Sequence, residues 1–175
     1  KRPKMNIVVC LDVSESMNES LCINERTRLE IAQEALCQLF RHTLDKQDTF
    51  GIITYNTKPT VEWDMTLLDS LPYGMVNLRR AILKFKASGT TNIEKAYKKA
   101  LSLFSDQILD NAKTEGIYNR IIFMTDLQLN KDKIDQYNDK KGIFGLIKKA
   151  AKDKEIYTTF MSMGIDQDEK LLHSS

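Results

Sequence analysis

Long hydrophobic runs are missing from this sequence. The longest apolar runs, at residues 7–11 and 121–124, are far shorter than the roughly 20 residues that a membrane-spanning helix needs. No signal-peptide pattern opens the chain, and neither internal repeats nor low-complexity stretches occur. We therefore expect a folded protein that does not insert into a membrane.

The sequence also lacks a strong charge of either sign. Its 26 basic and 24 acidic residues leave a net charge of +2, which is too small to predict binding to nucleic acid. A glycine-rich loop followed by Lys-Ser or Lys-Thr, which would cradle phosphates, is absent as well. These absences argue against nucleic-acid and nucleotide binding.

Cysteine is scarce, and the three cysteines are an odd number that does not suggest a disulfide framework. Cys10 and Cys37 fall on the apolar faces of a predicted strand and a predicted helix, where a reduced and buried thiol is the common state. This favours a cytoplasmic location. A glycosylation triplet that begins at Asn18 points weakly the other way, so the compartment stays open.

Strand-like and helix-like segments alternate along the chain. Short continuous apolar runs such as MNIVVCL at residues 5–11 predict strands buried on both faces, and apolar residues at helical spacing predict helices between them. We expect strands at residues 5–11, 49–55, 59–63, 120–125 and 156–163, and helices at 27–44, 67–71, 76–85, 92–109, 143–151 and 168–172. The pattern predicts one α/β domain with a mostly parallel central sheet, flanked by helices on both faces.

Carboxylates and hydroxyls follow these predicted strands at the points where the strands end. Asp12, Ser14 and Ser16 come directly after the first strand, and Asp126 follows the strand at 120–125. The loop 88–93, rich in hydroxyls, leads into a helix. Because the carboxyl ends of parallel strands meet at one edge, these side chains are expected to lie together. Oxygen ligands without Cys or His suit Mg²⁺ best, with Mn²⁺ or Ca²⁺ as alternatives, and disfavour Zn²⁺.

A metal held by few negative charges keeps part of its coordination shell for water or a ligand. A carboxylate from a partner protein could displace that water and gain a charge-assisted bond to the ion. This arrangement would give metal-dependent binding without breaking any covalent bond.

Three stretches resemble the three parts of the metal-ion-dependent adhesion site of von Willebrand factor A domains. They are DVSESM at residues 12–17, GTTNI at 89–93 and MTD at 124–126, and their order and spacing agree over nearly the whole chain. The resemblance implies a Rossmann-like doubly wound fold and an acidic partner residue at the open metal position. It implies metal binding through the hydroxyls of Ser14 and Ser16, through Thr91 directly or by way of water, and through Asp12 and Asp126 mostly by way of water. Thr90 is the alternative to Thr91.

The sequence departs from the family pattern at two positions and at its end. Glu15 replaces a small residue that is common inside the first motif, and Leu127 replaces the glycine that commonly follows the last aspartate. Known domains of the family continue with a further strand and helix. We therefore expect residues 1–175 to form a single domain that lacks these last elements, as a fragment of a larger protein.

Two other functions compete with metal-dependent protein binding. The first is a scaffold domain that binds through a helical face while its metal site is vestigial. The second is a Mg²⁺-dependent phosphohydrolase with Asp12 as nucleophile, but the second acid that this chemistry usually needs is replaced by Ser14. The two histidines, His42 on a helix end and His173 near the terminus, suggest no catalytic triad. We expect that the protein is not an enzyme.

Overall fold

A five-stranded sheet forms the centre of the molecule. The computed structural model describes residues 2–20, 25–126 and 142–162, and its strands lie in the order β3-β2-β1-β4-β5. Strand β1 pairs in parallel with β2 and β4, β4 pairs in parallel with β5, and β3 is antiparallel to β2. This confirms the predicted mostly parallel α/β sheet, in which β3 lies at one edge. The strands are β1 Met5–Asp12, β2 Thr49–Tyr55, β3 Pro59–Leu67, β4 Tyr118–Thr125 and β5 Ile156–Ser162.

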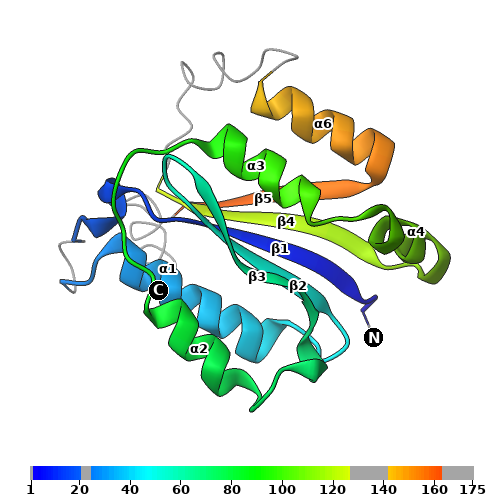
Figure 1. Cartoon of the computed structure of the whole chain (residues 1–175), viewed down its shortest axis with the longest axis horizontal. Helices are drawn as coiled ribbons and strands as arrows, with labels where there is room; N and C mark the ends of the chain where they lie inside the picture. Colours follow the sequence, from blue (N-terminus) through cyan, green and yellow to red (C-terminus); the bar gives the residue numbers. More distant parts are fainter. Residues whose placement is uncertain (1, 21–24, 127–141, 163–175) are drawn as a thin grey trace, which may run out of the picture.

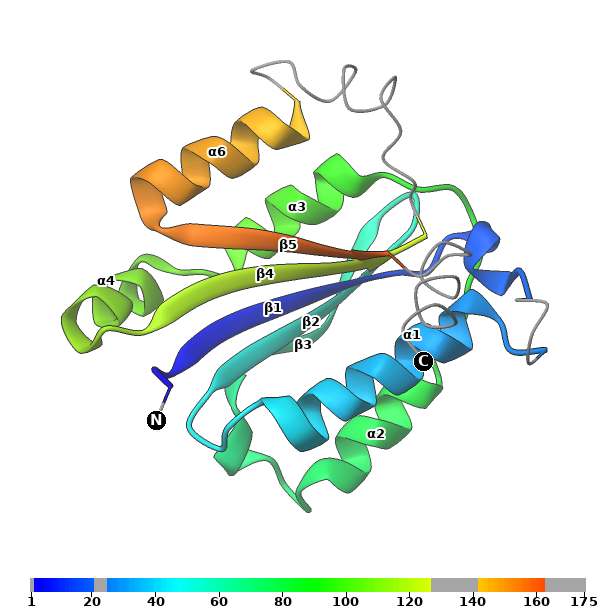
Figure 2. The same cartoon turned by 180° about the vertical axis from the view of Figure 1, so that it is seen from behind.

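Helices cover both faces of the sheet. Figures 1 and 2 show α1 and α2 on one face and α3 and α6 on the other. The helices are α1 Arg28–Gln38, α2 Met75–Leu83, α3 Ile93–Ser102, α4 Asp106–Glu115 and α6 Ile143–Lys154, with short helical turns at Glu15–Asn18, Leu39–Thr43 and Leu68–Ser70. No helix in the described part of the chain is both long and apolar enough to cross a membrane.

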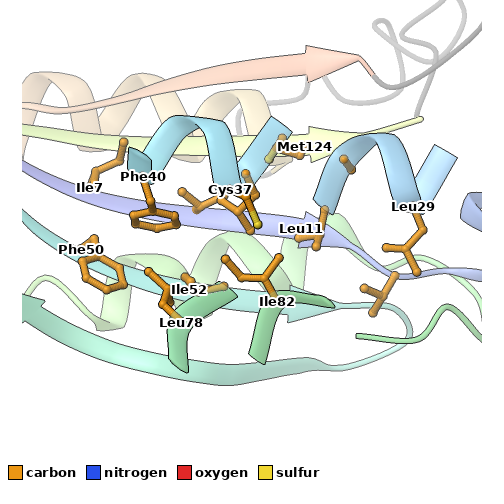
Figure 3. Packing of buried hydrophobic residues seen from close by; sticks show 14 of the residues in the cluster. Ile7, Leu11, Leu29, Cys37, Phe40, Phe50, Ile52, Leu78, Ile82 and Met124 are labelled. Carbon is orange, nitrogen blue, oxygen red and sulfur yellow. The ribbon is translucent and has the colours of Figure 1, made fainter. Parts of the chain in front are cut away.

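Side chains of β1 alternate between two hydrophobic layers. Ile7 and Leu11 pack in the layer under α1 and α2, whereas Val8 and Cys10 pack in the layer under α3 and α6. Figure 3 shows the first layer, where side chains from the sheet meet those from the two helices. Burial on both faces explains why the sequence of β1 is continuously apolar rather than alternating. Cys10 and Cys37 are both buried and unpaired, as predicted.

The prediction of a single helix at residues 92–109 is wrong, because this segment forms two helices. Helix α3 ends at Ser102, and α4 begins at Asp106. The Ser105 side chain accepts a hydrogen bond from the Ile108 N–H at 3.2 Å and so caps a new helix. Helix α4 then runs to Glu115 and stops at Gly116, whose φ of 69° is favourable for glycine.

Several other element boundaries differ from the sequence prediction. Strand β3 extends to Leu67 instead of residue 63, so the short helix predicted at 67–71 is only the turn Leu68–Ser70. Helix α1 ends at Gln38 and continues to Thr43 as a wider π-helical turn. The predicted helix at 168–172 lies outside the described residues.

Candidate functional site

The ends of β1 and β4 bring two sequence-distant acids to the same edge of the sheet. In the parallel pair, Leu11 lies opposite Met124, so Asp12 and Asp126 both follow at the carboxyl edge. A third segment, residues 84–92 between α2 and α3, runs along this edge, as Figure 1 shows. It is fixed to the loop after β1 by two backbone hydrogen bonds of 2.8 Å, from Ser88 to Val13 and from Glu15 to Gly89.

Asp12 organises the loop that follows β1. Its carboxylate is fully buried, and one oxygen accepts hydrogen bonds from the Ser14 N–H at 2.8 Å and from the Ser14 hydroxyl at 2.6 Å. The other oxygen accepts the Thr125 hydroxyl at 2.8 Å. Ser14 Oγ lies 3.2 Å from Ser16 Oγ. Because Ser14 gives its proton to Asp12, lone pairs of the Ser14 oxygen stay available for another ligand.

The electrostatic environment of Asp12 disfavours its charged form. Burial raises the pKa of Asp12, and the nearby charge of Asp126 raises it further, while the hydrogen bonds from Ser14 and Thr125 oppose the shift. A carboxylate in this position is stabilised by any positive charge that comes close to it.

Asp126 is paired with an arginine that the sequence reasoning did not include. Arg28 Nη1 donates to Asp126 at 3.2 Å and to Glu19 at 2.8 Å. The side chains of Arg28 and Asp126 are only 13% and 10% exposed, and the buried Arg28 Nε has no hydrogen-bond partner among the described residues. A positive charge thus lies beside one of the predicted metal ligands.

The two neighbouring threonines of the loop 88–93 have different surroundings. The hydroxyl of Thr90 lies 2.9 Å from that of Thr57 in the turn between β2 and β3. Thr91 is half-buried and makes no side-chain hydrogen bond with a described residue. Asn92 follows it as the N-cap of α3, accepting from the Lys95 N–H at 3.1 Å. Thr91 therefore has the freer hydroxyl of the two.

Glu15, one of the two departures from the family pattern, is exposed in the turn Glu15–Asn18. The other departure, Leu127, lies outside the described residues.

The donor set fits a small, hard cation. In an octahedral shell with metal–oxygen distances of about 2.1 Å, neighbouring ligand oxygens are about 3.0 Å apart. The 3.2 Å between the Ser14 and Ser16 hydroxyl oxygens is close to that spacing. Two carboxylates, Asp12 and Asp126, lie close enough to influence each other electrostatically. Among the described residues, no group of three or more His, Cys, Asp or Glu side chains gathers to hold a metal.

Two further residues lie around the site and were not identified from the sequence. Thr125 binds Asp12 directly, and Tyr55, at the end of β2, is fully buried with its ring 5.8 Å from that of Phe123. Burial raises the pKa of Tyr55 well above its usual value, and the charge of Asp12 raises it further. The only sequence signal that could have pointed to Thr125 and Tyr55 is that each is the last residue of a buried strand, β4 and β2 respectively.

The helix-flanked, mostly parallel sheet with a polar cluster at its carboxyl edge defines a Rossmann-like α/β domain. The sequence profile of the von Willebrand factor type A domain matches residues 7–128, and the chain belongs to this family. Domains of the family commonly mediate interactions between proteins. No curated protein matches the chain significantly.

Solved structures with the same fold include proteins from several bacteria. The conserved hypothetical protein BatB from Bacteroides thetaiotaomicron superimposes with a TM-score of 0.65 at 21% identity, over 90% of this chain and 66% of BatB. An aerotolerance-related membrane protein from Bacteroides fragilis NCTC 9343 gives a TM-score of 0.62 at 18% identity, over 90% of this chain and 67% of that one. A von Willebrand factor type A protein from Catenulispora acidiphila gives 0.56 at 16% identity, over 96% and 42%. This chain therefore spans about two thirds or less of these proteins, and the likeness concerns the fold.

Proposed function

We propose that this domain binds a partner protein through a divalent cation, with Mg²⁺ as the first choice and Mn²⁺ or Ca²⁺ as alternatives. The cation would be held by the hydroxyls of Ser14, Ser16 and Thr91, with Asp12 and Asp126 behind them. The observation that carries the proposal is the pair of hydroxyls 3.2 Å apart that the buried Asp12 holds in place.

Each residue of the site has a distinct role in this proposal. Asp12 accepts the Ser14 proton and thereby turns the lone pairs of Ser14 toward the cation. Thr91 belongs to the segment that two backbone hydrogen bonds hold beside the loop after β1, so its hydroxyl would add a third oxygen ligand. The bound cation supplies a positive charge to which a carboxylate can bind. Asp or Glu on the partner is the side chain that matches this charge.

The chemistry proposed is binding, without catalysis. In the described part of the chain no histidine lies at the site, because His42 lies in the turn Leu39–Thr43 after the far end of α1. His173 is outside the described residues. The second acid that a phosphohydrolase usually needs two residues after its nucleophile is absent. Position 14 is a serine, and its hydroxyl donates a hydrogen bond to Asp12. These features favour a binding module over a phosphohydrolase.

Calorimetric titration of Mg²⁺ into chelator-treated protein tests the proposal. The wild type should bind one ion, and Ser14→Ala should lose this binding while still unfolding cooperatively in chelator, at a somewhat lower temperature because the buried Asp12 carboxylate loses a hydrogen bond. Ser102→Ala is the matched control, because Ser102 has an exposed hydroxyl bonded to the Lys99 carbonyl on α3. It should bind Mg²⁺ as the wild type does. A wild type that binds no divalent cation would favour the alternative, a scaffold that binds through a helical face.

A further inference from the structure

A groove of about 530 Å³ lies next to the candidate metal site. One wall comes from the turn between β2 and β3 and from the start of β3, and the other comes from the end of α2 and the segment after it. Val13, which lies between Asp12 and Ser14, is part of the lining. The groove is therefore continuous with the loop that would hold the cation.

The lining of this groove is basic. Lys58 stands on one wall and Lys84 and Lys86 stand on the other, and all three are exposed. None of the three forms an ion pair with a described residue. Glu62 is the single acidic residue of the lining, and burial raises its pKa.

We propose that the groove binds an acidic, extended segment of the partner protein that flanks the carboxylate at the metal. This inference rests on the proposed function and names the chemistry of the partner. Side chains of Asp or Glu on either side of the metal-bound residue would pair with Lys58 on one wall and with Lys84 and Lys86 on the other. The lysines would then add affinity and fix the direction in which the partner chain runs.

Binding through side-chain charge fits this groove better than addition of a strand to the sheet. Strand β3 is at the edge, but its pairing with β2 shifts register between Phe50 and Ile52 and again between Ile52 and Ile53. Bulges of this kind interrupt the regular row of backbone groups that strand addition requires. A nucleic-acid partner is disfavoured because the chain has a net charge of only +2, which gives no extended basic surface for a continuous row of phosphates.

Two labelled peptides of nine residues test the inference. Both carry one central Asp, which is flanked by Glu in the first peptide and by Gln in the second. In saturating Mg²⁺ and low salt, the Glu-flanked peptide should bind the wild type roughly tenfold more tightly, as expected for about three exposed ion pairs. The advantage should shrink as salt rises.

Variants of the lysines complete the test. The triple variant Lys58→Gln, Lys84→Gln, Lys86→Gln should lose the preference for the Glu-flanked peptide while binding Mg²⁺ with unchanged affinity by calorimetry. The matched control Lys148→Gln, Lys149→Gln, Lys152→Gln changes the net charge equally on α6 and should keep the preference.

The outcomes separate this inference from the metal site itself. If Mg²⁺ binds but the wild type does not prefer the Glu-flanked peptide, the basic groove has no such role and the metal site stands. Equal loss of preference in the α6 control would show a general charge effect and overturn the inference. Peptide binding that persists in chelator, or that a single-stranded oligonucleotide abolishes, would identify a polyanion surface instead. Failure of the wild type to bind Mg²⁺, Mn²⁺ or Ca²⁺ would remove the proposed function and the inference with it.

Discussion

At the scale of single residues, Arg28 is the feature that most affects how the site can work. It donates to Asp126 at 3.2 Å from a side chain that is 13% exposed. A cation that recruits Asp126 has to compete with this charge-assisted hydrogen bond and with the positive charge of the guanidinium. Arg28 would therefore lower the affinity of the site for metal.

Removing the Arg28 charge should relieve this competition. Arg28→Gln should bind Mg²⁺ roughly tenfold more tightly than the wild type, because a hydrogen bond to a charged group contributes about 1.5–3 kcal/mol. Calorimetric titration measures the change. Arg26→Gln removes the same charge two positions away, where Arg26 Nη2 contacts the Glu30 carbonyl, and should leave the affinity unchanged. Weaker Mg²⁺ binding by Arg28→Gln would mean that Arg28 orders the site instead.

Asp12 gives a second prediction at this scale. In chelator, Asp12→Asn should unfold with a free energy within about 1 kcal/mol of the wild type, because removing a desolvated charge offsets its weaker hydrogen bonds. The same variant should lose any rise in melting temperature on adding Mg²⁺. Urea unfolding in chelator and thermal melts with Mg²⁺ measure the two effects. A variant that melts with the wild-type Mg²⁺ shift would show that Asp12 does not support a metal.

At the scale of elements, Asp48 links the starts of β1 and β2. This fully buried carboxylate accepts the Met5 N–H at 2.9 Å and the Asp45 N–H at 2.8 Å, and it also pairs with the Arg2 guanidinium. Burial opposes ionisation, but the Arg2 guanidinium and the backbone N–H groups outweigh it and lower the pKa of Asp48. The carboxylate therefore stabilises the end of the sheet opposite the candidate site.

Replacing this carboxylate should destabilise the fold in a pH-dependent way. Asp48→Asn should lower the free energy of unfolding by about 2–4 kcal/mol at pH 7. The side-chain NH₂ of Asn would face the backbone N–H groups and the Arg2 guanidinium, which are hydrogen-bond donors themselves. The folded pKa lies below the reference value of 3.8, so the wild-type advantage is complete above that pH and is lost as pH falls through the lowered value. Urea unfolding of both proteins at several pH values down to pH 3 measures this difference in the free energy of unfolding. The exposed neighbour variant Asp45→Asn should show a much smaller change.

Elements that carry a strong local signal could be predicted from the sequence. The continuous apolar run of β1 and the spacing of Asp12, Ser14 and Ser16 are local patterns, and the structure places the three residues together. The break between α3 and α4 was missed because apolar spacing continues through it, while Ser105 favours a new helix start. Arg28 was missed because its partner Asp126 is 98 positions away, and no local pattern reports such a pairing.

At the scale of the whole molecule, the two ends of the sheet are stabilised differently. The end near Asp48 is held by one buried carboxylate with backbone and guanidinium donors. At the carboxyl edge, two backbone hydrogen bonds join the loop after β1 to the segment 84–92, and the Thr125–Asp12 hydrogen bond joins it to the end of β4. Asp126 pairs with Arg28 on α1. A cation bound there would connect three segments that are far apart in the sequence.

A bound cation should therefore stabilise the carboxyl edge and leave the opposite end of the sheet unchanged. At a Mg²⁺ concentration of about 100 times its Kd, the domain should gain about 2.7 kcal/mol and melt roughly 5–10 °C higher than in chelator. Amide exchange should slow in residues 12–18 and 88–92 and remain unchanged around Asp48. Thr91→Ala should lose both effects, whereas Thr90→Ala should keep them, because the Thr90 hydroxyl is already paired with Thr57. The reverse result would assign the metal-binding hydroxyl to Thr90, and slowing spread evenly over the chain would indicate non-specific stabilisation by salt rather than a cation that joins the three segments.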